Sequence, residues 1–136
     1  MGKKRERKGF TLIELMVVIL IVGILAAVAI PLMRGRIDSA KWSEGKAMMG
    51  TIGTALRAYS AEKGDDGTWP PSLVQLGFMA GDLTGTYFVD ADFTWANAAY
   101  LSTATPPLTY TISCTPTTTT LVPATTTLSH LGVWTP

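Results

Sequence analysis

One uninterrupted apolar run dominates the first quarter of the chain. It extends from Phe10 to Ile30, and only Thr11 and Glu14 among its 21 residues are polar. As a helix rising about 1.5 Å per residue, the run is about 31 Å long, which matches the hydrocarbon core of a bilayer. A secretory signal peptide has an apolar segment of only about 7–15 residues. The pattern therefore predicts a membrane-spanning helix over residues 10–31.

The pattern becomes amphipathic after Pro31. Apolar residues recur at spacings of 7, 3, 4 and 3, at Trp42, Met49, Ile52, Leu56 and Tyr59. These spacings place them on one face of a helix, so residues 32–63 are predicted to continue the helix and to pack that face against a head. Pro31 lacks a backbone N–H, which predicts a bend or a local break of the helix there.

The remaining residues, 64–136, carry the signals of a small head. Gly64 to Gly67 predicts a turn, and Ser72 with Gln75 has the spacing of a capping box, which predicts a short second helix ending at Gly77. Strands are predicted at roughly Tyr87–Trp95, Leu108–Cys114 and Leu128–Trp134. The fold class is therefore α+β, with a long amino-terminal helix packed on three to four antiparallel strands.

Charge divides the chain at the start of the apolar run. Residues 1–9 hold five basic side chains and one acidic one, a net charge of +4, whereas the remainder holds six basic and nine acidic ones, a net charge of −3. Positive charge before a membrane helix stays in the cytoplasm, which sends the head to the other side. No basic stripe remains in the head, so direct nucleic-acid binding is not expected.

Glu14 interrupts the apolar run and needs an explanation. A lone acid costs about 2.5–3.5 kcal/mol at the centre of a membrane and less near its surface. It either reaches the headgroups, becomes neutral, or meets a cation.

The segment that contains Glu14 resembles a known family. KGFTLIELMVV, residues 8–18, followed by the apolar run and Pro31, is similar to the processing motif of type IV prepilins and type II secretion pseudopilins. The resemblance implies the type IV pilin fold, and it implies that a prepilin peptidase removes residues 1–9 by cleavage between Gly9 and Phe10. The same enzyme is then expected to N-methylate Phe10.

The resemblance also implies a mode of assembly. Glu14 of an incoming subunit is expected to pair with the new amino terminus at Phe10 of a neighbour, with a pairing inside one subunit as the alternative. The implied partners are copies of the chain and other pilins, the peptidase, an inner-membrane assembly platform and, before assembly, the membrane. The expected location is the inner membrane with a periplasmic head, and then an extracellular or periplasmic filament.

Three interpretations of the function stay open at this point. The first is a structural subunit of a type IV pilus, and the second is a pseudopilin of a type II secretion system. The third is a membrane-anchored module whose head binds DNA or another ligand. An enzyme is not expected, because the single histidine, His130, leaves only one possible base for a Ser-His-Asp arrangement.

Candidate chemistry in the head is sparse. Asp82, Asp90 and Asp92 could offer oxygen ligands to calcium, but Asp90 and Asp92 are also spaced like two solvent-facing acids on a strand. No metal site or cofactor is predicted. The only cysteine, Cys114, is expected to be a buried strand residue. The threonine-rich stretches 117–120 and 125–127 are expected to form an exposed loop or an edge strand, with a glycosylated surface as the alternative.

Overall fold

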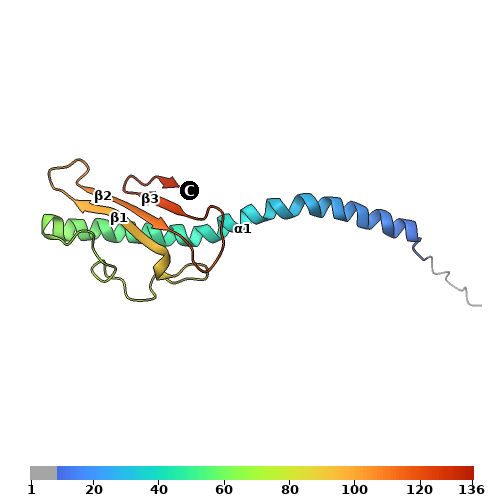
Figure 1. Cartoon of the computed structure of the whole chain (residues 1–136), viewed down its shortest axis with the longest axis horizontal. Coiled ribbons are helices and arrows are strands. Elements are labelled where there is room, and N and C mark those ends of the chain that lie inside the picture. Colours follow the sequence, from blue (N-terminus) through green and yellow to red (C-terminus); the bar gives the residue numbers. More distant parts are fainter. Residues whose placement is uncertain (1–8) are drawn as a thin grey trace, which may run out of the picture. The chain divides into compact units, whose positions relative to one another are not determined.

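A computed structural model describes residues 9–136, and helix α1 (Leu12–Lys63) is its longest element (Figure 1). The prediction that the helix continues to about Lys63 is confirmed. The predicted break at Pro31 is wrong, because α1 is helical on both sides of that residue. Proline removes one helical hydrogen bond, and its fixed φ suits a helix, so the neighbouring turns hold the segment together. The bend remains a prediction.

The chain forms two units that divide within α1, one ending at Ile37 and the other spanning Asp38–Pro136. The apolar side chains of the first unit are exposed, with Leu20 at 63% and Ile24 at 60%. Within the described residues, α1 is the one helix long and apolar enough to cross a membrane. Such a surface requires a cover of lipid or of other helices.

The second unit packs the rest of α1 on a four-stranded antiparallel sheet with the order β1-β2-β3-β4. The strands are β1 (Phe93–Tyr100), β2 (Leu108–Cys114), β3 (Thr126–Ser129) and β4 (Trp134–Thr135). Strands adjacent in the sequence pair with each other, as in a meander, and the sheet lies along α1 (Figure 1). The predicted α+β class is confirmed.

The predicted strands differ from the observed ones at both ends of the sheet. β2 has the predicted bounds, but β1 begins at Phe93, because a short 3₁₀ helix occupies Asp90–Asp92. The third predicted strand is wrong, since a tight turn divides it into β3 and β4. Gly132 adopts a φ of +79° in that turn, and its N–H donates to the Ser129 carbonyl at 2.9 Å. Glycine tolerates this left-handed conformation at little cost, and it was the turn signal in the sequence.

The short helix predicted after Ser72 is also wrong, although its capping box forms. The Ser72 N–H donates to Gln75 Oε1 at 2.8 Å, and the Gln75 N–H donates to Ser72 Oγ at 3.3 Å. Residues 73–77 nevertheless form only turns, and Gly77 has a φ of +87°. Nucleating a helix is costly, and the segment after Ser72 is long enough for only about one helical turn. Two reciprocal hydrogen bonds do not offset that cost.

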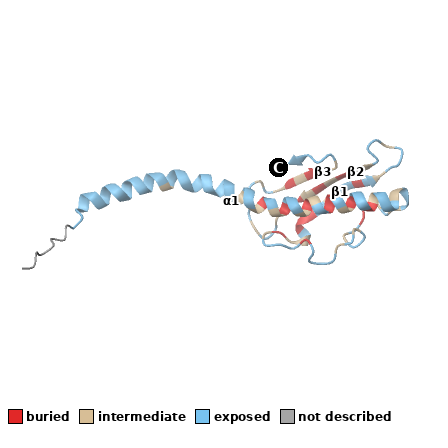
Figure 2. Ribbon diagram, turned by 180° about the vertical axis from the view of Figure 1, so that it is seen from behind, coloured by how far each residue is buried: buried red, intermediate tan, exposed pale blue. Residues whose placement is uncertain are grey.

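The apolar stripe predicted on the helix forms the core of the head (Figure 2). All five of its members are buried: Trp42, Met49, Ile52, Leu56 and Tyr59. The residues of β2 alternate as predicted, with Tyr110, Ile112 and Cys114 buried. A β-carbon built at Gly45 would lie only 2.8 Å from the Phe88 ring, so this glycine allows the helix to pack closely.

Gly45 and Gly50 should respond in opposite ways to substitution by alanine. Gly45→Ala should lower the free energy of unfolding by about 1–2 kcal/mol, because the new methyl group overpacks against the Phe88 ring. Gly50→Ala should raise it by about 0.5–1 kcal/mol, because a β-carbon there meets no atom within 4 Å and alanine favours the helix. Urea denaturation in detergent measures both. Equal effects would contradict the packing described.

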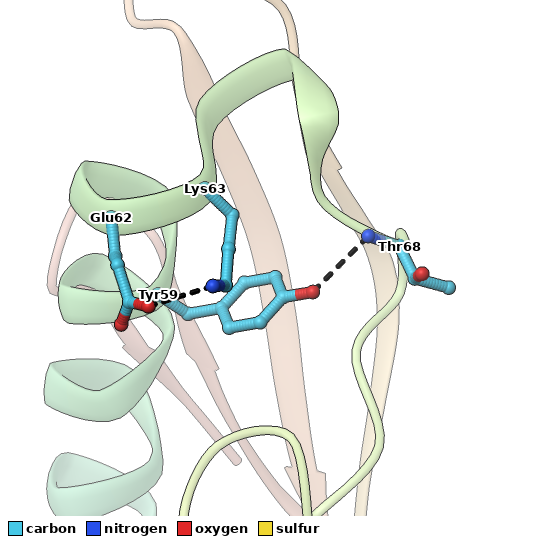
Figure 3. Close-up of polar contacts among 4 residues, drawn as sticks. All are labelled: Tyr59, Glu62, Lys63 and Thr68. Carbon is cyan, nitrogen blue, oxygen red and sulfur yellow. Dashed lines mark hydrogen bonds and ion pairs between the residues drawn. The ribbon is translucent and has the colours of Figure 1, made fainter.

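The end of α1 is tied to the loop that follows it (Figure 3). The Thr68 N–H donates to the Tyr59 hydroxyl at 3.1 Å, and Lys63 Nζ lies 2.7 Å from Glu62. The hydrogen bond to Glu62 raises the pKa of Lys63. Trp69 packs edge-on against Tyr59 with ring centroids 5.3 Å apart. These contacts hold the predicted turn after Lys63.

Candidate functional site

The predicted cleavage site lies immediately before α1. Gly9, Phe10 and Thr11 are not helical, and Phe10 is 83% exposed. Nothing lies within 4 Å of a β-carbon built at Gly9. An exposed, non-helical peptide bond is the form in which a protease binds its substrate. The rest of the predicted leader, residues 1–8, falls outside the described residues.

Thr11 and Glu14 together cap the first turn of α1. The Thr11 N–H donates to Glu14 Oε2 at 2.8 Å, and the Thr11 hydroxyl donates to the same oxygen at 2.7 Å. In return the Glu14 N–H donates to Thr11 Oγ1 at 3.3 Å. This is a capping box, with Thr11 as the N-cap and Glu14 at the third helical position.

The capping box changes the interpretation of Glu14. Its carboxylate lies at the positive end of the helix dipole and already has two donors, so it is stabilised locally before any neighbour arrives. In this uncleaved chain the hydrogen bonds of Glu14 go to Thr11, and Phe10 has no free ammonium group, so both pairings of Glu14, within one subunit and between neighbours, stay predictions. The role of Thr11 was missed in the sequence analysis, although the T-x-x-E spacing was its signal.

The same segment matches a family model. Residues 4–30 match the model described as the prokaryotic N-terminal methylation motif. The predicted family resemblance is confirmed. The methylation motif thus covers Gly9, Phe10, the capping box and most of the apolar part of α1.

Curated relatives of the chain are fimbrial and secretion proteins. Fimbrial protein EcpC of Eikenella corrodens is 39% identical over 84 residues, which cover 62% of this chain and 52% of that protein. Type II secretion system core protein G of Pseudomonas aeruginosa is 43% identical over 60 residues, or 44% and 42% of the two chains. Type IV major fimbrial protein FimA of Dichelobacter nodosus is 37% identical over 95 residues, or 67% and 52%.

The chain spans about half the length of these curated relatives. No solved structure matches it. The methylation motif is therefore established for the amino-terminal segment, and the role of the head has to be argued from its own residues.

Asp92 does not face solvent, although its place in a predicted strand suggested that it would. It is 2% exposed, and its carboxylate accepts hydrogen bonds from the Val89 N–H at 2.9 Å, the Thr117 N–H at 2.9 Å and the Thr117 hydroxyl at 2.6 Å. The expectation of a solvent-facing acid is wrong, because residues 90–92 turn as a 3₁₀ helix. Asp92 joins that turn to the threonine-rich loop.

Asp90 and Asp82 also accept hydrogen bonds from nearby backbone N–H groups. Asp90 accepts from the Gly81 N–H at 2.5 Å and from the Leu83 N–H at 3.0 Å. The bond from Gly81 is the main cause of the lowered pKa of Asp90. Asp82 accepts from the Met79 N–H at 2.8 Å. Among residues 9–136, no group of three or more His, Cys, Asp and Glu side chains is placed to hold a metal ion.

Cys114 is buried on β2, as predicted. Burial, and next the nearby charge of Asp92, raise the pKa of its thiol to about 12. At pH 8 about one thiol in ten thousand is then ionised, and the thiolate is the reactive form.

The folded chain should therefore leave Cys114 unlabelled by maleimide at pH 8, and the chain unfolded in urea should be labelled fully. A Thr94→Cys variant, in which an exposed position of β1 carries a second thiol, is the control and should react at once. Mass spectrometry counts the labels. Fast labelling of the unaltered folded chain would contradict the burial of Cys114.

Proposed function

We propose that this chain is a structural subunit of a type IV pilus or pilus-like filament. The observation that carries the proposal is the amino-terminal segment, in which an exposed Gly9–Phe10 bond precedes a capped helix that is apolar up to Ile30 except for Glu14. The matched methylation motif and the fimbrial relatives support it. No catalytic role is proposed for the head.

Processing is the first step of the proposed function. A prepilin peptidase at the cytoplasmic face of the inner membrane cleaves after Gly9 and methylates the new amine of Phe10. The head lies in the periplasm at this stage. Cleavage removes a leader with a net charge of +4 and leaves one ammonium group, so the strongest cytoplasmic anchor is lost.

Assembly is the second step. The apolar part of α1 passes from lipid into a core made of the same helix from neighbouring copies and other pilins, with an inner-membrane platform as the site of transfer. Glu14 of one copy meets the Phe10 ammonium of another. Thr11 supplies donors to only one oxygen of the Glu14 carboxylate, Oε2. The other oxygen faces no donor from Thr11 and is suited to the incoming ammonium.

Replacing Glu14 tests this proposal. Glu14→Ala should be cleaved and methylated but should not enter filaments, because the charge that aligns neighbouring copies is lost. Asp38→Ala, which removes another acid of α1 outside the apolar run, should assemble normally. Mass spectrometry measures processing, and electron microscopy of sheared filaments measures assembly. Normal filaments made of the Glu14→Ala chain would overturn the assembly step.

A periplasmic secretion pseudopilus is the second candidate, and the similarity to a type II secretion core protein supports it. Labelling the head on intact cells separates the two candidates. Surface filaments that carry the label support a pilus. A label confined to the periplasm, together with loss of protein secretion when the chain is deleted, would overturn the pilus in favour of the pseudopilus.

A further inference from the structure

Positive charge in the described chain is confined to one element. Six cations lie on α1: Arg34, Arg36, Lys41, Lys46, Arg57 and Lys63. Within residues 9–136 only Lys63 has a carboxylate partner, Glu62. Beyond Lys63 the head holds five aspartates and no lysine or arginine. The loops and strands of the head therefore carry only acids, and its basic side chains all lie on α1.

The first surface, called the hairpin face, consists of Lys46, Arg57, Leu131, Val133 and Trp134. Leu131 is 72% exposed, Val133 55% and Trp134 40%. Lys46 Nζ lies 5.6 Å from the centroid of the Trp134 ring, and Arg57 donates to the His130 carbonyl at 3.5 Å. The two cations are 11 residues apart, so they lie on nearly the same side of α1, about 16 Å apart along its axis. Each flanks one end of the β3–β4 hairpin.

The second surface, called the loop face, consists of Val74, Met79, Asp82 and Asp90. Val74 is 80% exposed and Met79 is 77% exposed. The two aspartates belong to one loop, because Asp90 accepts a hydrogen bond from the Gly81 N–H and Asp82 accepts one from the Met79 N–H. Lys41, the cation beside this loop, lies over the Tyr87 ring at 5.2 Å. This face therefore carries exposed apolar side chains and two acids, with the single cation Lys41 at its edge.

The two faces lie on opposite flanks of α1 in the head. Glu44 accepts a hydrogen bond from the Tyr87 N–H at 2.9 Å, and so marks the side of the helix that meets the loops. Glu44 is two residues from Lys46, which places them about 160° apart around the helix. Figures 1 and 2 both draw the hairpin on one side of α1 and the loops after α1 on the other. The faces of one copy therefore cannot meet each other.

We propose that the hairpin face of one copy docks on the loop face of the next copy. Each face offers exposed apolar side chains, and the cations of the hairpin face match the acids of the loop face. Contact between two hairpin faces or two loop faces would bring like charges together, which selects the unlike pairing. A contact between two different surfaces repeats without closing, so it builds a filament rather than a dimer. This inference rests on the proposed function and adds the head surfaces that join neighbouring copies.

Cysteine cross-linking of the full chain in filament-producing cells tests the pairing. A Met79→Cys/Leu131→Cys chain treated with a short bismaleimide should give a ladder of covalent multimers. Each single variant should stay monomeric, because its two like faces do not meet. The native Cys114 is fully buried and does not contribute. Filaments that give no ladder, or dimers from Leu131→Cys alone, would overturn the proposal.

Charge reversal gives a second test that does not depend on the introduced thiols. Lys46→Glu/Arg57→Glu should lower filament yield about tenfold, while cleavage and methylation stay unchanged and thermal unfolding remains cooperative. Lys63→Glu reverses a cation outside both faces and should leave the yield unchanged. Equal yields from the two variants would overturn the docking, even if filaments form. Absence of filaments from the unaltered chain would instead overturn the proposed function, so the two failures are distinguishable.

Discussion

Gly9→Val should leave the chain uncleaved and unmethylated in cells that contain a prepilin peptidase. A branched side chain before the scissile bond obstructs the close approach of substrate backbone to a protease cleft, and it restricts the backbone freedom that glycine has there. The substitution should not disturb the fold, since no atom lies within 4 Å of a β-carbon at Gly9. The loss should therefore be complete and should arise at the peptidase.

Mass spectrometry of the amino-terminal peptide measures this outcome directly. Gly35→Val is the matched control, because Gly35 is also open at its β-carbon position and lies outside residues 4–30. It should be cleaved and methylated like the unaltered chain. A Gly9→Val chain that still begins at N-methylated Phe10 would show that the proposed cleavage does not require this glycine.

Asp92→Ala should lower the free energy of unfolding by about 3–5 kcal/mol, the largest loss expected for a single change in the head. The buried carboxylate accepts three hydrogen bonds, and two of their donors are the backbone N–H groups of Val89 and Thr117. Alanine leaves both groups without a partner in a site that is 2% exposed. The threonine-rich loop should separate from the turn before β1.

Urea denaturation followed by tryptophan fluorescence measures the loss in the detergent-solubilised chain. Asp66→Ala removes the same charge from an exposed aspartate for which the structure shows no side-chain hydrogen bond, and should change stability by under about 0.5 kcal/mol. Asp92→Asn should fall between the two, since an amide offers one acceptor oxygen instead of two. Similar stabilities for Asp92→Ala and Asp66→Ala would contradict the role given to Asp92.

Prediction from the sequence succeeded where the pattern was long or strictly periodic. The stripe from Trp42 to Tyr59 repeats with the helical period over several turns, and all its members are buried. β2 alternates strictly, and its bounds were predicted correctly. Prediction failed at short segments. Leu128–Trp134 has the composition of a strand, but one glycine with a positive φ divides it into a hairpin.

Local sequence by itself determined the amino-terminal segment: its glycine, its capping box and its apolar helix all act within a few residues of one another. Only the tertiary structure decided the roles of Asp92 and Glu44, because each of them binds a residue that is far away in the sequence. Asp92 binds Thr117, 25 residues later, and Glu44 binds Tyr87, 43 residues later. The separation of basic and acidic faces arises in the same way, since the fold places the β3–β4 hairpin and the loops on opposite sides of α1.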